Sequence, residues 1–511
     1  MRLTIPFLFL CSCFFIVVNS ARAQTDAVGI FDGQCDVGNT ALKGGAVWRP
    51  GTQDYIIEGA GVNMWFGHDE FHFAWKKLKG DFILRAQAAF VGKGVETHRK
   101  FGWMVRSSLD SSATHVNAVV HGDGLTSLQF RKTVGGTTEE KKSALTGVEV
   151  VQLERRGNRY IMSVARTGDT LVSEQLDGLE LGDEVYVGLF VCSHNPAVME
   201  KAVFRNVRMI VPAKAGFIPY RDYIGSNIEV MDMANGNSSI LYQSPRSLQA
   251  PNWTHDGQSL VYNSEGLLYR LPLTPGAAPA VINTGFANRN NNDHVLSFDG
   301  KQIGISHQPP AEKSASIVYV LPLGGGEPRR ITKTGPSYLH GWSPDGQWLL
   351  FTGQRNNDFD IYKIPVNGGD EVRLTTAPGL DDGSEFSPDG KYIYFNSART
   401  GTMQVWRMKP DGSGQEQITN DAFNNWFPHV SPDGKWVVYI SFPHDISPDD
   451  HPFYKHVYLR LMPAGGGATK VIAYVYGGQG SINTPSWSPD SKRIAFVSNT
   501  QLLFDTFPVG K

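Results

Sequence analysis

A net charge of one sign is almost absent from this 511-residue sequence. Its 47 Lys and Arg side chains are balanced by 49 Asp and Glu side chains, a formal net charge of −2, and no long run carries one sign. Proteins that neutralise phosphates need clustered basic side chains, so the sequence argues against nucleic acid as a partner. The 41% hydrophobic and 19% charged content is typical of a folded globular protein.

Long hydrophobic runs are also scarce, and only one run suggests a targeting or membrane segment. It extends from Leu3 to Val18, follows Arg2 and precedes Ala21-Arg22-Ala23. This pattern predicts a secretory signal peptide at residues 1–23 with cleavage after Ala23, because the run is short for a membrane span of about 20 residues. We therefore expect a periplasmic or secreted protein with no membrane span after cleavage.

Cysteine is rare, with four residues in the whole chain. Cys11 and Cys13 fall in the predicted signal peptide, so the mature chain would keep only Cys35 and Cys192. These two allow at most one disulfide, which export to an oxidising compartment permits. Two buried free thiols are the alternative, and the sequence leaves both open.

A five-residue motif recurs six times in the second half of the chain. It reads Trp-Ser-Pro-Asp-Gly at 342–346, and the other copies begin at Trp253, Leu296, Phe386, Val430 and Trp487. From one Ser or Thr to the next, the spacings are 43, 46, 44, 44 and 57 residues, a period typical of β-propeller blades. Pro and Gly suit a tight hairpin turn, so the motif predicts the turn after each blade's inner strand.

The strands that follow each motif complete the blade pattern. Lys391–Phe395 alternates like a second strand, and Gln404–Met408 and a Gly-rich turn come after it. These motifs resemble the TolB-type propeller repeat from residue 217 to about 500. Asn227–Tyr242 looks like the last two strands of a blade whose first two come from Trp487–Val497. The sequence therefore predicts a six-bladed propeller over 217–511, closed by strands from both of its ends.

Residues 24–212 contain no repeat and no convincing helix. Alternating segments such as Asp81–Ala86 and Gly102–Arg106 predict a single β-sandwich. The stretches "GVNMWFGHDEFHFAWKKLKGDFIL" and "GWMVRSSLD" resemble the concanavalin-like lectin/glucanase domains. That resemblance implies a sugar-binding face, for which Trp65, Arg106 and His121 are candidates because sugars need an aromatic platform and planar polar side chains. The alternative is that these side chains belong to the core.

The predicted fold class is all-β, a concanavalin-like β-sandwich followed by a six-bladed TolB-like β-propeller. In a propeller, the loops leading to each inner strand and those between second and third strands open on one central funnel. The candidate metal ligands there are His294, His340 and His429; the candidate catalytic residues are Glu385, His429, Asp382, Asp450 and His451; the candidate ligand-binding residues are Arg289, Arg355 and Trp426. Such imidazoles and carboxylates suit Mn²⁺, Zn²⁺ or Ca²⁺, or acid/base work on a sugar. Alternatively they hydrogen-bond channel water.

Two classes of function remain open. The first is an exported carbohydrate-binding protein, with a glycoside hydrolase or polysaccharide lyase as its catalytic form and a poly- or oligosaccharide as its partner. The oligogalacturonate lyases resemble this propeller in repeat type. The second is a non-catalytic TolB-like envelope protein that binds a peptide or protein. A peptidase of the propeller-plus-hydrolase kind is disfavoured because no Gly-x-Ser-x-Gly motif follows the last blade.

Overall fold

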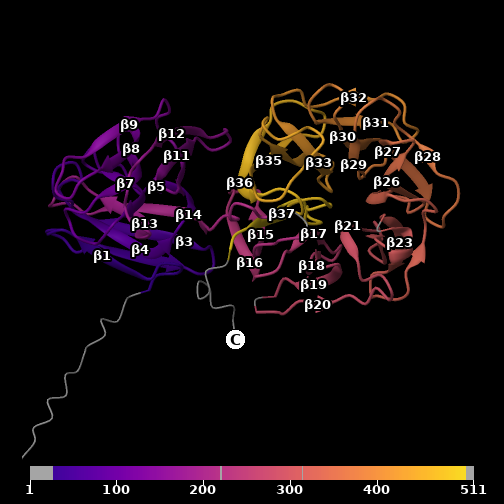
Figure 1. The fold of residues 1–511 in the computed structure, drawn as a ribbon, viewed down its shortest axis with the longest axis horizontal. Coiled ribbons are helices and arrows are strands. Elements are labelled where there is room, and N and C mark those ends of the chain that lie inside the picture. Colours follow the sequence, from indigo (N-terminus) through magenta and orange to yellow (C-terminus); the bar gives the residue numbers. More distant parts are fainter. Residues whose placement is uncertain (1–26, 219–220, 275, 314, 502–511) are drawn as a thin grey trace, which may run out of the picture.

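The computed structural model describes residues 27–501 except 219–220, 275 and 314. They form two bodies side by side, a two-sheet sandwich and a ring of six sheets (Figure 1), so the predicted all-β fold is confirmed. Pro310–Glu312 is a single 3₁₀ turn, and no helix in the described ranges is long and apolar enough to cross a membrane. The predicted signal peptide lies outside the described residues.

The N-terminal body is a β-sandwich of two seven-stranded antiparallel sheets. In spatial order the first sheet holds β1 (Gly33–Val37), β4 (Phe71–Lys79), β13 (Glu184–Cys192), β6 (Lys100–Arg106), β7 (His115–His121), β8 (Thr126–Arg131) and β9 (Glu139–Lys142). The second sheet holds β12 (Val172–Leu176), β11 (Arg159–Ala165), β10 (Val150–Arg156), β5 (Phe82–Phe90), β14 (Glu200–Ile210), β3 (Asp54–Gly59) and β2 (Gly45–Arg49).

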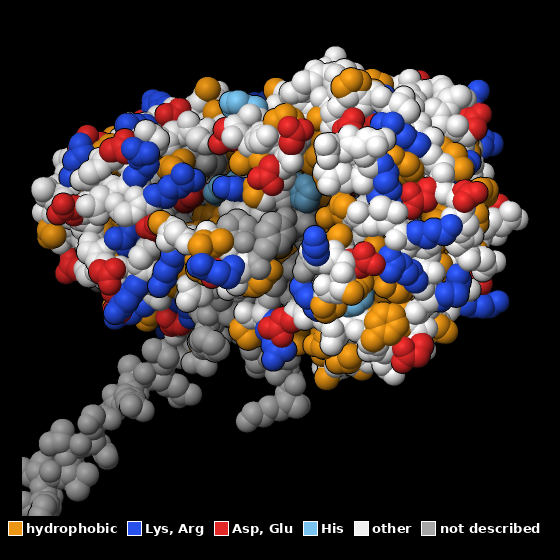
Figure 2. Space-filling view, turned by 45° about the vertical axis from the view of Figure 1, so that its right-hand side comes forward, with side chains coloured by type: hydrophobic (Ala, Val, Ile, Leu, Met, Phe, Trp, Pro, Cys, Tyr) orange, Lys and Arg blue, Asp and Glu red, His pale blue; other side chains and the backbone are white. Residues whose placement is uncertain are grey.

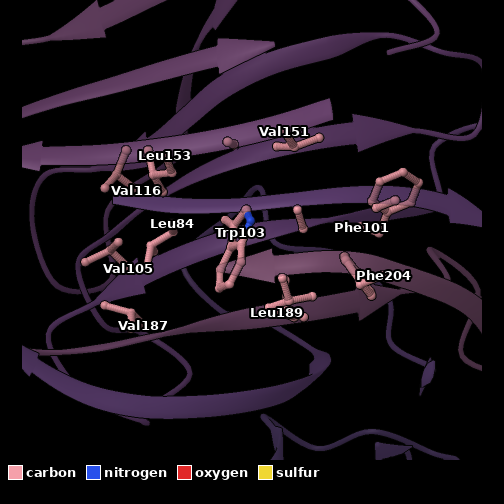
Figure 3. Close-up of a cluster of buried hydrophobic side chains, with 14 of the residues drawn as sticks. Leu84, Phe101, Trp103, Val105, Val116, Val151, Leu153, Val187, Leu189 and Phe204 are labelled. Atoms are coloured by element: carbon pink, nitrogen blue, oxygen red, sulfur yellow. The ribbon is translucent and has the colours of Figure 1, made fainter. Parts of the chain in front are cut away.

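Side chains that point between the two sheets form the sandwich core (Figure 3). Trp103 on β6 and Leu189 on β13 belong to one buried cluster with Leu84 on β5 and Phe204 on β14. Because side chains alternate along a strand, Met104 points to the opposite face of the first sheet. The alternation predicted for Gly102–Arg106 is therefore present, and both Trp103 and Met104 are buried.

The outer face of the first sheet carries a second buried cluster, which the segment 61–70 helps to cover. Met64 of this segment packs with Met104, and Asp69 is fully buried beside them. Cys35 and Cys192 belong to the same cluster as free thiols. Strand β4 lies between the strands that carry them, so the two cysteines are not on neighbouring strands.

The C-terminal body is a propeller of six sheets, and five of them have four strands. In each of these sheets the strands follow one another from the inner to the outer edge. The first two sheets hold β17 (Gln249–Trp253), β18 (Ser259–Ser264), β19 (Leu267–Pro272) and β20 (Ala280–Val281), and then β21 (Asn290–Leu296), β22 (Gln302–His307), β23 (Ile317–Pro322) and β24 (Arg329–Arg330). The other three hold β25 (Ser337–Trp342), β26 (Trp348–Arg355), β27 (Asp358–Pro365) and β28 (Val372–Arg373); β29 (Asp381–Phe386), β30 (Ile393–Ser397), β31 (Gln404–Met408) and β32 (Glu416–Gln417); and β33 (Asn424–Val430), β34 (Trp436–Phe442), β35 (Lys455–Pro463) and β36 (Lys470–Gly477).

The sixth sheet closes the ring as the sequence predicts. It joins β37 (Arg493–Asn499) from the C-terminal end to β15 (Ser226–Asp232) and β16 (Ser238–Ser244) from the N-terminal end. The register of β15 on β37 runs without a break from Ser226↔Asn499 to Asp232↔Arg493. In place of an inner strand this blade has one bridge, Trp487↔Ile494. The pairing leaves no open edge at the seam of the ring.

The recurring motif is the hairpin turn between the first and second strands of a blade. In the fourth copy, Ser387 Oγ donates to Asp389 Oδ1 at 2.8 Å and accepts from the Tyr392 N–H at 3.0 Å. Gly390 ends the turn with φ +69°, a left-handed conformation that favours glycine. The motif is therefore structural.

The second sheet of the sandwich docks on the closing blade and on the blade of β33–β36. Arg208 on β14 forms a buried ion pair of 2.6 Å with Glu229 on β15. The Tyr474 hydroxyl on β36 donates to the Asp169 carbonyl at 2.6 Å, and His456 Nε2 lies 3.3 Å from Glu154 Oε2. Basic and acidic side chains are interspersed over both bodies on the face in Figure 2.

Truncation of the closing strand tests its contribution to stability. Phe496 on β37 is 2% exposed, whereas Phe298 in a blade turn is 40% exposed. Phe496→Ala should lower the free energy of unfolding by about 3–5 kcal/mol because it opens a cavity in the seam. Phe298→Ala is the matched control and should change it by less than about 0.5 kcal/mol. Denaturant midpoints measure both, and an unchanged midpoint for Phe496→Ala would show that the seam does not stabilise the ring.

Candidate functional site in the propeller funnel

A cavity of about 1060 Å³ opens at the centre of the ring, walled by residues from every four-stranded blade. Amide side chains are its most frequent lining: Gln249, Asn263, Asn290, Asn291, Asn292, Gln308, Asn357, Gln479 and Asn483. Five carboxylates join them: Glu265, Asp293, Asp358, Asp382 and Asp449. The aromatic rings in the wall are those of Tyr223, Tyr338, Phe359 and Phe427. The size is typical of small-molecule sites.

β-Bulges in the inner strands decide which side chains reach this cavity. The pairing of β25 with β26 passes from Leu339↔Phe351 to Gly341↔Leu350, so His340 is the extra residue and faces the funnel. Similar irregularities interrupt β21 between Asn290 and His294 and β29 between Asp382 and Glu385. A bulge adds an unpaired residue and re-aims the neighbouring side chains.

Asp293, His340 and Asp382 form the electrostatic centre of the wall. His340 Nε2 lies 3.0 Å from Asp382 Oδ1, and the Thr352 hydroxyl donates to the same oxygen at 2.6 Å. Burial opposes the charged form of Asp382, but the charge and hydrogen bond of His340 outweigh it and lower the pKa of this carboxyl to about 2. Burial likewise opposes the imidazolium, but Asp382 and Asp293 outweigh it and raise the pKa of His340. Both shifts favour the charged form of the Asp382–His340 pair.

Asp293 differs from Asp382 because its partner is neutral. Its Oδ2 accepts a hydrogen bond of 2.6 Å from the Asn291 amide, and burial raises the pKa of Asp293 to about 6. The two carboxyls of the wall therefore titrate in different pH ranges, and at mildly acidic pH Asp293 is protonated while Asp382 stays ionised. Such a split is the usual sign of distinct acid and base roles where a site is catalytic.

An aromatic wall from the β33 blade supports His451. The His451 ring lies 4.4 Å from Trp426 and 5.2 Å from Phe427, and burial lowers its pKa. Phe427 also stacks on His340 at 5.9 Å and holds φ +52°, a left-handed conformation that is costly for a bulky residue. Trp426 is fully buried behind the wall, so this predicted ligand-binding residue supports the site without lining it.

Three buried polar atoms of lining residues have no hydrogen-bond partner within the described protein. They are Asn290 Oδ1, Asn292 Nδ2 and His451 Nδ1. An unmade hydrogen bond at a buried group costs about 1–3 kcal/mol, so a polar partner at any of these atoms would be stabilising. They provide one acceptor, one donor pair and one ring nitrogen that can serve either way.

The structure places the other predicted funnel residues elsewhere. His294 is buried against a neighbouring strand, with Nε2 3.3 Å from the Val261 carbonyl, because the bulge in β21 turns Asp293 and not His294 toward the cavity. Glu385 and His429 form a buried pair between blades, with His429 Nδ1 2.6 Å from Glu385 Oε2. Glu385 Oε1 also accepts from the Val430 N–H at 3.2 Å. Glu385 and His429 thus link the inner strands β29 and β33 of neighbouring blades.

The remaining predicted propeller residues also lie outside the lining. Asp450 and Arg289 are exposed. Arg355 forms an ion pair of 2.9 Å with Glu371 and donates to the Pro336 carbonyl, so it fastens loops of its own blade. Of the predicted residues, His340, Asp382 and His451 are those that the fold brings to the cavity.

No three His, Cys, Asp or Glu side chains in the described part of the chain are grouped as a metal site requires. The trio expected to bind a divalent metal is dispersed, because His294 and His429 point away from the funnel that His340 lines. The described residues therefore do not fit a metal ion in the predicted arrangement.

Two sugar candidates of the sandwich, Arg106 and His121, lie on the covered face of its first sheet, and Trp65 lies in the segment 61–70 that helps to cover it. Arg106 is fully buried and is held by the Ser108 carbonyl and by Asp69, 3.4 Å from its Nη2. His121 is buried beside Gln129, 3.2 Å from its Nε2, and burial lowers its pKa to about 3. Trp65 is half-buried. The positions of Arg106 and His121 therefore agree with the alternative that these side chains belong to the core.

The protonation of Asp293 predicts a pH-dependent difference in stability. A carboxyl whose pKa rises on folding destabilises the native state above that pKa and has no such effect below the unfolded value, near 3.9. Asp293→Asn should therefore melt on the order of a few degrees above wild type at pH 7.5 and close to wild type at pH 4. Asp450→Asn, an exposed change of the same chemistry, is the control. A melting difference equal at both pH values would contradict this assignment.

Comparison with known proteins agrees with this geometry. A model of the TolB β-propeller domain (PD40) matches residues 310–447. An uncharacterized protein of Agrobacterium fabrum is 46% identical over 272 residues, which are 53% of this chain and 92% of that protein. A solved Agrobacterium tumefaciens structure, provisionally assigned as TolB, shares 44% identity with a TM-score of 0.53 and covers 55% of this chain and 100% of its own.

The Tol-Pal system protein TolB of Bordetella pertussis is more distant, with 26% identity over 211 residues, 40% of this chain. The chain spans only 46% of that protein's length. The ring of six sheets, the recurring turn motif and the relationship to the Agrobacterium protein agree with one another. The chain belongs to the family of TolB-type β-propeller proteins.

Proposed function

We propose that this protein is an exported carbohydrate-binding protein that holds a neutral or amino-bearing oligosaccharide in its propeller funnel. The observation that carries the proposal is the composition of the wall, which combines amides, carboxylates and aromatic rings around one cavity. Amides both donate to and accept from hydroxyl groups, and aromatic faces stack on the C–H faces of sugar rings. The partnerless atoms of Asn290, Asn292 and His451 would complete their hydrogen bonds on such a ligand.

The charge of the wall favours this ligand over a uronate. The only arginine or lysine among the described lining residues is Arg246, and it already forms an ion pair of 2.9 Å with Glu265. The imidazolium of His340 is likewise paired with Asp382. Arg289 and Arg355, which a lyase could have used to neutralise a uronate carboxylate, do not line the cavity. Anionic sugars would therefore meet uncompensated carboxylates.

Hydrolysis of the bound glycan is a second candidate, favoured by the contrast between the two central carboxyls. Asp293, with its raised pKa, would act as the acid and Asp382 as the ionised carboxylate. Glu385 and His429, the predicted pair, have no access to the cavity in this geometry. Release of new reducing ends during the binding experiment would select this candidate.

A TolB-like envelope role is the remaining alternative, in which the funnel takes a peptide or a protein segment. Sequence identity to a Tol-Pal system protein favours it. The residues that line the funnel belong to the propeller and not to the sandwich. A sugar and a peptide would therefore contact the same wall.

Substitution of one lining amide tests the proposal. Asn292 is 3% exposed and its Nδ2 has no partner, so Asn292→Leu should fold while removing a donor from the cavity. Calorimetric titration with neutral and chitosan oligosaccharides should show about a tenfold loss of affinity in the variant, the value of one hydrogen bond. Asn288→Leu, an exposed position outside the lining, is the matched control and should bind like wild type.

Two further arms sharpen this experiment. Oligogalacturonate should bind more weakly than the neutral oligosaccharides, and EDTA should leave the affinity unchanged because the proposed contacts need no metal. Tightest binding of oligogalacturonate would contradict the charge argument. A failure of all these glycans to bind, together with binding of a peptide that depends on Asn292, would replace the proposal with the envelope alternative.

A further inference from the structure

Arg85 lies at the centre of the interface between the two bodies. It is on β5, in register with Gln152 on β10 and Arg208 on β14, on the sheet face that meets the propeller. The side chain is 7% exposed, and its one hydrogen bond is a long contact of 3.5 Å from Nη1 to Gln152 Oε1. Among the described residues, no carboxylate lies within ion-pair distance of it.

The nearest acid is already used by other donors. The Arg208 guanidinium donates to the Glu229 carboxylate. Its Nε lies 3.3 Å from each carboxylate oxygen, and its Nη2 lies 2.6 Å from Oε2. The Ser238 hydroxyl donates to Oε2 at 2.7 Å, and the Ser498 hydroxyl donates to Oε1. Glu229 therefore compensates Arg208, and the second guanidinium of this buried cluster keeps an uncompensated charge.

A small cavity adjoins this guanidinium. It measures about 40 Å³ and is lined by Arg85, Arg208 and Glu229 together with apolar atoms of Met231, Tyr474 and Phe496. A groove of about 460 Å³ between the bodies shares Gln87, Met231, Ile472 and Tyr474 with it, so the two spaces lie on either side of the same side chains. The inner space suits a group of a few heavy atoms, and the groove suits a small molecule.

The chemistry of the pair of spaces points to an anion. Burial lowers the pKa of Arg85 to about 10, so the side chain stays cationic at neutral pH. Leaving a buried charge without a counter-charge costs several kcal/mol. The exposed Arg205 and Lys470 line the groove and would attract an anion, against the single exposed acid Glu149.

We propose that this interface holds a small monocarboxylate, with its carboxylate on the Arg85 guanidinium and its body in the groove. A planar carboxylate matches the fork of N–H donors of arginine, and the walls of Met231, Ile472 and Tyr474 accept an apolar body. Because residues of both bodies line the site, the bound acid stabilises their association. This site is independent of the funnel.

Thermal unfolding of the purified chain at constant ionic strength tests the proposal, with sodium acetate, propionate or benzoate replacing sodium chloride. Carboxylate should raise the melting temperature of the wild type with saturation, as ligand binding to the native state requires. Arg85→Met should weaken this effect at least tenfold in ligand concentration. Arg49→Met, at an exposed arginine on β2 that lines neither space, is the matched control and should keep saturation within about threefold of wild type.

The wild-type titration decides the outcome even if Arg85→Met fails to fold. Absence of a saturable rise above the chloride baseline with all three acids would overturn the proposal. A saturable rise that is unchanged in a folded Arg85→Met variant would also overturn it.

Discussion

Closure of the ring sets the positions of the blades, of the funnel and of the surface on which the sandwich docks. A propeller stays intact only if its last blade joins its first, and here β37 from one end pairs with β15 from the other over seven residues. Glu229 stands within that pairing and accepts hydrogen bonds from Ser498 on β37 and Ser238 on β16. It also forms the ion pair with Arg208 of the sandwich. The seam of the ring and the docking of the two bodies therefore share one buried carboxylate.

A closed ring fixes where the inner strands point, and the bulges then choose which side chains enter the funnel. His340 is the extra residue of its strand, and Phe427 takes a left-handed backbone conformation in another. Both conformations carry a cost, which the surrounding blades compensate through pairing and packing. The outcome is a polar cavity in which Asp382 is paired and Asp293 is not, so one protein wall offers an ionised and a protonatable carboxyl.

The repeat made the fold predictable, because its period and turn chemistry give six blades and the position of the seam. The same repeat was also used to locate funnel-facing residues by counting along the sequence, and that prediction was correct only in part. Counting three residues back from the Ser of the motif (Ser297 and Ser343) selects both His294 and His340, yet only His340 lines the cavity. A count along the sequence assumes a regular strand, and the bulges shift it by a different amount in each blade. Asn292 and Asp293 belong to the polar run 288–294, and the sequence does not show which side chains of this run face inward.

The interface between the bodies was beyond prediction for a different reason. Arg85 and Arg208 alternate with apolar core residues, so each pattern predicts an outward-facing charge on a sandwich. Only the docking of the propeller turns that outer face into a buried one. The sugar candidates Arg106 and His121 were misjudged for a similar reason. Strand alternation places them on an outer face, but the segment 61–70 helps to cover that face and they are buried.

If the funnel is the ligand site of this protein, a bound ligand should protect the inner strands, because these strands carry the lining residues. Hydrogen–deuterium exchange with and without a saturating neutral oligosaccharide measures this protection. We expect it in peptides that contain Asn290–Asp293, Ser337–His340 and Asp381–Asp382, and none in the sandwich sheet that carries Arg106 and His121. Protection confined to the sandwich, with unchanged exchange in the inner strands, would contradict a ligand site in the funnel.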